Sequence, residues 1–443
     1  MSFNIGLSGL YAANKQLDVT GNNIANVATT GFKSSRAEFE DVYSATKLGS
    51  GSKTTGNGVR LANVSQQFTQ GDVNNTGNVL DMGINGSGFF VLNDNGSLSY
   101  TRAGTFKVDK EGYVTNSDGS ARLQGYGVDA NGKILNGVLT DLRIDTSNLA
   151  PKTTTTVSST INLNSTSLEI DQVANPFDPN KEASFTKQFS TKVYDTQGNE
   201  HIMDQFMVKT GPNTWKTYSL IDGRNPDGSD PTLAASPPLA STMNFNTSGT
   251  LTSVTTPVVP ATIPPSVITS PDLKVTGWVP GTVTNGVWKA NGAGSDPGGV
   301  TISLADTTQY NADTARSIPT QNGYATGQIT NLTIDASGVM LANFSNNQTK
   351  AIGQISLASF TNEQGLQPVG GTSWKETYSS GIPGYDAPNT GSLGEIHSNS
   401  LEESNVNLTS ELVELIKAQS NYQANAKTIS TQSTIMQTII QMT

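Results

Sequence analysis

The sequence predicts a mixed, mainly β fold in which two terminal α-helices pair as a coiled coil. Stacked β-rich domains of barrel or sandwich type are inserted between them. Two observations predict this architecture. Large apolar residues recur at seven-residue spacing near both chain ends, a pattern typical of helices that bury one narrow seam against partner helices. Between the ends, abundant Gly, Asn, Thr and Ser residues favour turns and short strands over long helices.

The first helix is expected over residues 3–28, within a terminal helical domain made of residues 1–32 and 401–443. Its predicted seam contains Phe3, Leu7, Leu10, Leu17, Ile24 and Val27. The sequence Thr29-Thr30-Gly31 is expected to end it, because Gly suits the position after a helix. Gly21, which costs about 1 kcal/mol relative to Ala, makes this helix marginal when it is alone in water.

The second terminal helix is expected to begin at Leu401 and to continue to residue 443, a length of roughly 64 Å. Its predicted seam contains Leu401, Leu408, Leu412, Leu415, Tyr422, Ile429, Met436 and Ile440. Amphipathic helices often pack only inside their own domain, but both of these stripes are terminal and adjoin linkers. We therefore expect the helices to pack on each other and to keep a second apolar face for neighbouring subunits.

Residues 33–80 and 379–400 are expected to form an extended connecting region between the helices and the β-domains. Glu38 to Tyr43 is compatible with one helical turn or more. Residues 48–58 are a polar, Gly-rich loop, and residues 379–396 are rich in Gly, Pro and Ser, as linkers are.

The first β-domain is expected over residues 81–147 together with 325–378. Phe89 to Leu92 is a strand, and the sequence Asp94-Asn95-Gly96 is a hairpin turn signal. Tyr100 to Val108 is expected to be the next strand. Further strands are expected at 113–115, 123–126, 329–334, 339–344 and 352–360.

Residues 148–324 are expected to form an outer β-region of one domain or two. Residues 185–195 and 201–210 are predicted to be paired strands, and residues 215–221 another strand. Six prolines lie in residues 254–280, which favours edge strands or a connector there, since Pro cannot donate to a strand ladder.

The composition argues against several classes of function. The net charge is −10 and the 26 Lys and Arg residues are scattered, whereas a nucleic-acid binder shows a basic patch or stripe. No stretch approaches the roughly 20 apolar residues of a membrane-spanning helix. Cysteine is absent, so neither a disulfide nor a cysteine metal site is possible. The first residues also lack the continuous apolar run of a cleaved signal peptide.

No catalytic, cofactor-binding or metal-binding residue is predicted, and no cofactor. His201 and His397 are the only histidines and lie far apart in the sequence, so both are expected to be surface or interface side chains. The glycines of residues 83–88 precede a strand and lack the Lys-Ser/Thr ending of a phosphate-binding loop. The Asp-Asn-Gly clusters lack the bidentate Glu of a calcium loop and are explained as hairpin turns.

Several separate motifs resemble those of the bacterial flagellar rod and hook family, in the same order along the chain. At the start, residues 6–10, 17–27 and 30–33 are similar to the family's N-terminal signature. The first β-domain and the C-terminal part carry similar blocks at 85–91, 100–104, 123–126, 345–349, 400–408 and 419–427. Asn407 stands where the family often has Asp. The first ten residues and the long insertion at 146–324 are most similar to the hook branch, because rod proteins are shorter.

This resemblance implies a subunit that polymerises into a curved, hollow tube acting as a universal joint between motor and filament. Terminal helices would form the inner layer and β-domains the outer layers. The implied partners are further copies of the chain, flagellar rod proteins, the hook cap, hook–filament junction proteins and the flagellar type III export apparatus. The implied location is extracellular, reached without signal cleavage, with neither nucleic-acid binding nor membrane insertion.

Two alternatives remain at this stage. One is a distal rod or hook–filament junction protein of the same family. The other is a secreted β-rich adhesin or carbohydrate-binding protein, which should show a groove with clustered aromatic side chains. The four tryptophans are dispersed along the sequence, so nothing in it supports such a groove directly.

Overall fold

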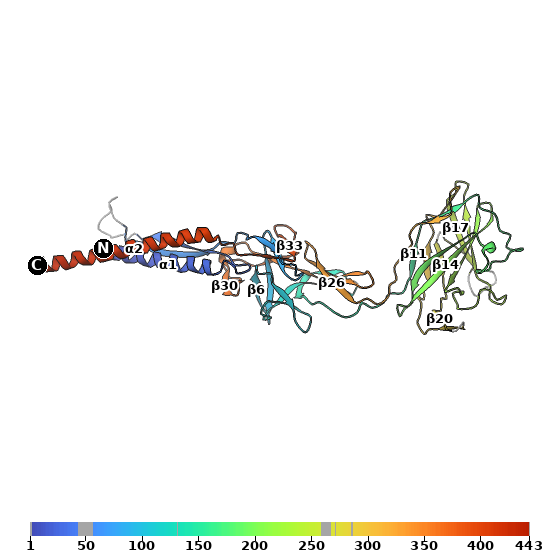
Figure 1. The fold of residues 1–443 in the computed structure, drawn as a ribbon, viewed down its shortest axis with the longest axis horizontal. Helices are drawn as coiled ribbons and strands as arrows, with labels where there is room; N and C mark the ends of the chain where they lie inside the picture. The colour runs from blue at the N-terminus through green and yellow to red at the C-terminus, as the bar shows by residue number, and fades with distance from the viewer. Residues whose placement is uncertain are drawn as a thin grey trace. The chain divides into compact units, whose positions relative to one another are not determined.

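A computed structural model describes residues 2–42, 56–130, 132–257, 267–270, 272–284 and 287–442 (Figure 1). The described chain divides into two compact units. Unit 1 comprises residues 1–146, 329–343 and 349–443, and unit 2 comprises residues 147–328 and 344–348. Both units are built mainly from strands, and the long helices α1 (Ser2–Ala25) and α2 (Leu408–Met442) belong to unit 1.

The mainly β fold with paired terminal helices is confirmed. In Figure 1, α1 and α2 lie side by side. The two helices are antiparallel, because Asn23 near the end of α1 bonds to Glu411 near the start of α2, whereas Gly6 near the start of α1 meets Ile429. Asn407 caps the start of α2. The Asn407 Oδ1 accepts a hydrogen bond from the Ser410 N–H at 3.0 Å, as the side chain of an N-cap residue does.

The β-part of unit 1 joins strands from both halves of the chain. Its largest sheet contains 13 strands among the described residues, and within it β9 pairs with both β5 and β28. The strands of this sheet are β5 (Phe89–Asp94), β6 (Ser97–Thr101), β7 (Phe106–Val108), β8 (Val114–Asn116), β9 (Arg122–Val128), β10 (Ile134–Asp141), β26 (Ile329–Ile334), β27 (Val339–Phe344), β28 (Thr349–Ile355), β29 (Leu357–Ser359), β30 (Gln367–Gly370), β31 (Ser373–Lys375) and β32 (Gly384–Asp386).

The expected strand from Tyr100 to Val108 is interrupted. β6 ends at Thr101 and β7 begins at Phe106, with the family-like segment 102–104 between them. Gly104 passes so close to the backbone of Met82 that a Cβ on it would lie 1.6 Å from the Met82 carbonyl oxygen. The chain turns there to follow a neighbouring backbone, and only glycine permits that approach.

The expected connecting region is more regular than the sequence suggested. Instead of a helical turn at 38–43, β1 (Ser35–Asp41) pairs antiparallel with β2 (Val59–Gln66), while residues 43–55 lie outside the described residues. β3 (Val73–Asn75) pairs with β34 (Ser400–Glu402), and β4 (Met82–Asn85) pairs with β33 (Glu395–Ser398). Residues 379–400 therefore carry strands that belong to the sheets of unit 1 rather than a free linker.

Unit 2 is a sandwich of sheets around one main core. A six-stranded antiparallel sheet follows chain order from β13 to β18, and the pairing predicted for residues 185–210 is confirmed by the β13–β14 register. Its strands are β13 (Lys187–Tyr194), β14 (Glu200–Gly211), β15 (Thr214–Ile221), β16 (Ala240–Phe245), β17 (Leu251–Pro257) and β18 (Val267–Ser270).

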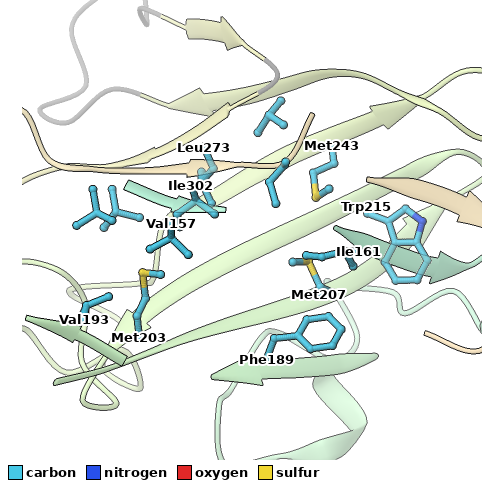
Figure 2. Close-up of a cluster of buried hydrophobic side chains, with 14 of the residues drawn as sticks. Val157, Ile161, Phe189, Val193, Met203, Met207, Trp215, Met243, Leu273 and Ile302 are labelled. Carbon is cyan, nitrogen blue, oxygen red and sulfur yellow. The ribbon is translucent and has the colours of Figure 1, made fainter. Parts of the chain in front are cut away.

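Smaller sheets cover the inner face of this six-stranded sheet. Their strands are β11 (Thr156–Ser158), β12 (Ile161–Asn164), β19 (Asp272–Val275), β22 (Val300–Ser303), β23 (Thr308–Tyr310), β24 (Ala315–Arg316) and β25 (Thr320–Gln321), and β20 (Gly281–Thr284) pairs with β21 (Val287–Ala290). Figure 2 shows Val157 and Ile161 from these sheets beside Met203 and Met207 of β14. The apolar side chains between the two layers form the core of unit 2.

Candidate functional site

Small residues make the contact between α1 and α2. A Cβ on Gly6 would lie 3.1 Å from Cγ1 of Ile429, and one on Gly9 only 2.5 Å from Oδ1 of Asn425. Ala13 of α1 and Ala418 of α2 are both buried. The helix axes therefore approach closely along a narrow strip, and the larger heptad side chains are displaced to its sides.

None of the predicted seam residues is buried within the chain. Those that are half-buried are Leu7, Leu10, Leu17, Ile24, Val27, Leu401, Leu415 and Ile429. Those that are exposed are Phe3, Leu408, Leu412, Tyr422, Met436 and Ile440. Ile416 and Ile439, which lie beside the seam of α2, are exposed as well, and so are Tyr11, Val413 and Ile435, which the sequence pattern did not select.

The C-terminal part of α2 extends beyond α1. Gly6 packs against Ile429, after which α2 continues to Met442, whereas only Ser2 to Ile5 precede Gly6 in α1. The difference of about nine residues corresponds to roughly 13 Å of helix. Figure 1 shows this part of α2 projecting past the start of α1. The exposed side chains of Ile435 and Ile439 lie on the projecting part.

Two of the seam residues lie outside the helices. Leu401 was expected to open the second helix, but it lies in strand β34, paired with Asn74 of β3. Val27 follows the end of α1 at Ala25. The heptad spacing at Leu401 therefore falls in a strand, beside Glu402, whose side chain is buried in a cluster of charged groups.

That cluster, here called the unit 1 ion cluster, consists of Lys33, Arg102 and Glu402. Their side chains are at most 3% exposed. Lys33 Nζ lies 2.6 Å from Glu402 Oε1, and Arg102 Nη1 lies 3.1 Å from Glu402 Oε2. Lys33 also donates to the Thr69 carbonyl at 2.7 Å, and the Gly71 N–H donates to Glu402 Oε1 at 3.0 Å. Burial lowers the pKa of Lys33, although the charge of Glu402 opposes that shift.

The unit 1 ion cluster joins three family-like motifs that are distant in sequence. Lys33 closes the N-terminal motif, Arg102 lies at the break between β6 and β7, and Glu402 lies in the segment before α2. The Glu402 carbonyl also accepts the Gly31 N–H at 2.8 Å. One carboxylate therefore ties the chain leaving α1, the β-sheet and the chain entering α2. The sequence contains the three charged residues in family-like motifs, but it does not show that their side chains meet.

Asparagine side chains reinforce the same junction. Asn23 of α1 is buried, and its amide exchanges two hydrogen bonds with the backbone of Ser35 at the start of β1. It also donates to Glu411 Oε1 of α2 at 3.1 Å. Burial raises the pKa of Glu411, the bond from Asn23 opposes this, and Glu414 adds to the rise. Asn405 accepts from the Ser34 N–H at 2.7 Å.

Unit 2 contains a buried cluster of the opposite composition, here called the unit 2 ion cluster. His201 was expected at a surface or interface, but its side chain is only 3% exposed. Its Nδ1 lies 2.5 Å from Asp222 Oδ2 and its Nε2 lies 3.3 Å from Asp195 Oδ2. His397, by contrast, is exposed beside Glu395.

Both ring nitrogens of His201 face carboxylates, which only accept hydrogen bonds when ionised. The doubly protonated ring satisfies both partners. Burial alone would lower the pKa of His201, but the hydrogen bonds to Asp222 and Asp195 outweigh burial and raise it. Burial likewise favours a higher pKa for Asp195, yet bonds from Asn199, Asn291 and His201 lower it.

The described residues contain no group of three or more His, Cys, Asp or Glu side chains placed to hold a metal ion. Neither of the described helices is long and apolar enough to cross a membrane. The arrangement is suited to association: a helix pair with exposed apolar side chains, fixed to β-structure by a buried ion cluster.

Models of flagellar rod, basal-body and hook protein families match both terminal helices and the β-units inserted between them. Four family models match in chain order. They are described as "Flagella basal body rod protein" (residues 3–33), "Flagellar hook protein FlgE/F/G D1 domain" (83–172), "Flagellar basal body protein FlaE D2 domain" (162–324) and "Flagellar basal body rod FlgEFG protein C-terminal" (397–442).

Proteins that are similar to this chain over its full length identify the family within this class. The flagellar hook protein of Escherichia coli is 38% identical over 100% of both chains, and that of Salmonella typhimurium is 37% identical over 100% of both. The hook protein of Borreliella burgdorferi is 31% identical over 99% of this chain and 98% of its own. The chain belongs to the flagellar hook protein family, a family of structural proteins of the bacterial flagellum. These matches favour neither a rod or junction protein nor an adhesin.

A crystal structure of a Helicobacter pylori flagellar hook protein aligns with 74% of this chain and 100% of its own, at 15% identity and a TM-score of 0.48.

Proposed function

We propose that this chain polymerises into the curved, hollow tube of the hook and acts there as a universal joint that transmits torque from motor and rod to filament. The observation that carries this proposal is the exposed apolar surface of α1 and α2. Apolar side chains at both ends of α2, among them Leu412, Ile416 and Ile439, remain exposed although the helix is already paired. Contiguous exposed apolar surface on a folded chain marks an interaction site.

The predicted seam residues are proposed to complete their burial between subunits rather than within one. Each half-exposed Leu or Ile that becomes buried contributes roughly 1 kcal/mol. Because many such residues lie on one helix pair, repeated contacts between copies would give a torsionally strong inner layer. A head-to-tail contact that does not close into a ring produces a helical filament.

The chain is proposed to be divided into the terminal helical domain, the connecting region, the first β-domain and the outer region 148–324. The helical domain forms the inner layer, and the β-structure forms the outer layers. Its surface is rich in Asn, Thr and Ser, and polar, wet contacts can exchange between similar registers more easily than packed apolar ones. This division of labour would let the tube bend while it rotates.

The remaining partners follow from the same assignment. Rod proteins, the hook cap and junction proteins would contact the ends of the tube, and the flagellar type III apparatus would export the subunit without signal cleavage to an extracellular position. A helix pair that buries few large apolar side chains on its own would be easy to unfold for passage through a narrow channel.

The test alters only exposed apolar positions of α2. The double substitution L412D and I416D should abolish tube formation at concentrations where the unchanged chain forms tubes, seen by electron microscopy and sedimentation. The matched control places the same charges at polar, exposed positions of the same helix, S410D and S420D. Circular dichroism should show the same helix content in both variants. Normal tubes from L412D/I416D protein would refute the proposed interface.

A further inference from the structure

Three polar side chains on the adjacent strands β14 and β15 of unit 2 have buried polar atoms with no hydrogen-bond partner among the described residues. They are Gln205 on β14 and Thr217 and Ser219 on β15. The unpaired atoms are both the oxygen and the nitrogen of the Gln205 amide, together with the hydroxyls of Thr217 and Ser219. Gln205 is 0% exposed and Thr217 is 1% exposed. Reversing the amide of Gln205 would not supply a partner, because both of its ends are unpaired.

The strand register brings these groups together. Gln205 lies directly opposite Ser219 in the β14–β15 pair, and Thr217 lies opposite Met207. Since side chains two apart share one face of a strand, Thr217 and Ser219 point the same way, as do Gln205 and Met207. Figure 2 shows Met203 and Met207, which flank Gln205 on β14, pointing into the core of unit 2. The three polar groups therefore form one patch inside an apolar core.

The hydroxyls of Ser159 and Thr307 in unit 2 are also buried without a partner among the described residues, but many other buried polar side chains are paired. Buried Gln309 accepts from Trp215 Nε1 at 2.9 Å in the same core. Gln354 donates to the Ser337 carbonyl at 2.9 Å, and buried Gln124 bonds to Asp141. Ser241 bonds to Thr256 at 3.1 Å on strands next to the patch. Of the glutamines buried in the described chain, Gln205 is the one whose amide lacks such a partner.

Leaving four such atoms unpaired and dry would be costly, because each buried unsatisfied polar group is unfavourable and native proteins pair nearly all of them. Native proteins satisfy such groups with ordered water as well as with protein atoms. Ser159, between β11 and β12 on the facing side, has a buried hydroxyl that is likewise without a partner among the described residues.

We propose that the patch formed by Gln205, Thr217 and Ser219 is an internal water-binding site of unit 2. The ligand class is a small uncharged molecule that both donates and accepts, and a buried water typically makes about three hydrogen bonds to groups of this kind. One water placed between the facing strands accepts from the Gln205 amide nitrogen and donates to the Thr217 or Ser219 oxygen. A second water serves the Gln205 amide oxygen. The site is independent of polymerisation.

The substitution Gln205→Met separates a hydrated patch from a dry one by the sign of its effect. If water satisfies the amide, methionine removes those hydrogen bonds and leaves the remaining hydroxyls without a bridge, so the melting temperature of the full-length chain falls. If the amide is dry and unpaired, methionine removes an unfavourable group and the melting temperature rises. Gln309→Met is the matched control. It removes an amide of the same core that is paired directly, so it should lower the melting temperature.

Two further measurements keep the proposal open to refutation even if Gln205→Met folds poorly. The triple variant Q205M/T217V/S219A, which removes every polar group of the patch, should melt above Q205M, because no hydroxyl then needs a bridge. A high-resolution crystal structure of the unchanged full chain should show a density peak within hydrogen-bonding distance of Gln205 and Ser219. A raised melting temperature in Q205M, or side chains that bond one another with no peak between them, would overturn the proposal.

Discussion

The two buried ion clusters of this chain use charge in opposite ways. The unit 1 ion cluster places one carboxylate, Glu402, between two cations, whereas the unit 2 ion cluster places one imidazole, His201, between two carboxylates. The central group in unit 1 is a carboxylate, whereas the central group in unit 2 is a histidine, the side chain whose ordinary pKa lies nearest neutral pH. Burial lowers the pKa of Lys33 in the first cluster, whereas in the second cluster the hydrogen bonds to Asp222 and Asp195 outweigh burial and raise the pKa of His201. The two clusters are therefore expected to respond to pH in opposite senses.

The clusters also differ in what they connect. Lys33 and Glu402 are 369 residues apart in sequence, so the unit 1 ion cluster joins segments from the two ends of the chain. His201 lies 6 residues from Asp195 and 21 residues from Asp222, so its ring contacts join segments that are close in the sequence. The first cluster decides how the terminal helices join the β-sheet, and the second cluster only stabilises one end of a sandwich.

The largest expected effect comes from Glu402→Ala. It removes the one anion and leaves Lys33 and Arg102 buried together without compensation, which should cost about 3–5 kcal/mol in the free energy of unfolding. Hydrogen–deuterium exchange read by mass spectrometry should show faster exchange in β3, β34 and the first turns of α2.

The matched control for this change is Glu403→Ala, one residue along the chain, where the carboxylate is exposed and accepts only from Asn74. That variant should exchange like the unchanged chain. Equal protection in the E402A and unchanged proteins would show that the unit 1 ion cluster does not hold the helices to the sheet.

The next largest effect is expected from Asp195→Ala in unit 2. The Asp195 carboxylate is fully buried and accepts from the Gln197 and Asn199 N–H groups and from the side chains of Asn199, Asn291 and His201. Since His201 keeps Asp222, the loss should be smaller than for Glu402, at about 3 kcal/mol. Chemical denaturation followed by tryptophan fluorescence measures it. A loss exceeding that of E402A would reverse the ranking of the two clusters.

Local patterns in the sequence were sufficient for the elements that local physics determines. The paired helices follow from apolar spacing, and the turn at Asn95-Gly96 has the positive φ angles, 49° and 93°, that its residues favour. The pairing of β13 with β14 follows from two alternating runs joined by a short polar turn. Each of these is decided by residues close together in the chain.

The parts that the sequence could not supply depend on contacts between distant segments. Leu401 fits the heptad spacing, yet pairing with β3 and the burial of Glu402 hold it in a strand. The break at Gly104 depends on the Met82 backbone passing beside it. The seam residues were chosen for size, but Gly6 and Gly9 take the contact within the chain, because close helix packing selects small residues that a search for large apolar ones overlooks.

The third prediction concerns pH and separates the two units directly. The pKa of His201 is raised in the folded chain, so its contribution to the stability of unit 2 is fully present below about pH 6.5 and is lost as pH rises through the folded pKa. The His201 ring faces two carboxylates, those of Asp195 and Asp222, and Asp195 also accepts hydrogen bonds from Asn199 and Asn291. The melting temperature of unit 2 should therefore fall between neutral and alkaline pH. His201→Gln should melt lower at pH 6 and show a flatter pH dependence.

Unit 1 should behave in the opposite sense over the same range. Burial lowers the pKa of Lys33, so the unfolded chain binds more protons at this residue than the folded chain does, and its contribution favours folding more as pH approaches about 10.5. Hydrogen exchange measured separately on peptides of the two units at each pH compares them within one sample. Parallel loss of protection in both units would contradict the different composition of the clusters.

The smallest effect is expected from His397→Gln, which completes the comparison because it removes the other histidine. His397 lies 3.0 Å from Glu395, but both side chains are well exposed, at 47% and 38%. Exposed pairs are screened by water and salt and contribute little to stability. The melting temperature of this variant should match that of the unchanged chain at every pH between 6 and 9. A pH dependence weakened by H397Q as much as by H201Q would mean that burial between two carboxylates is not what makes His201 responsive.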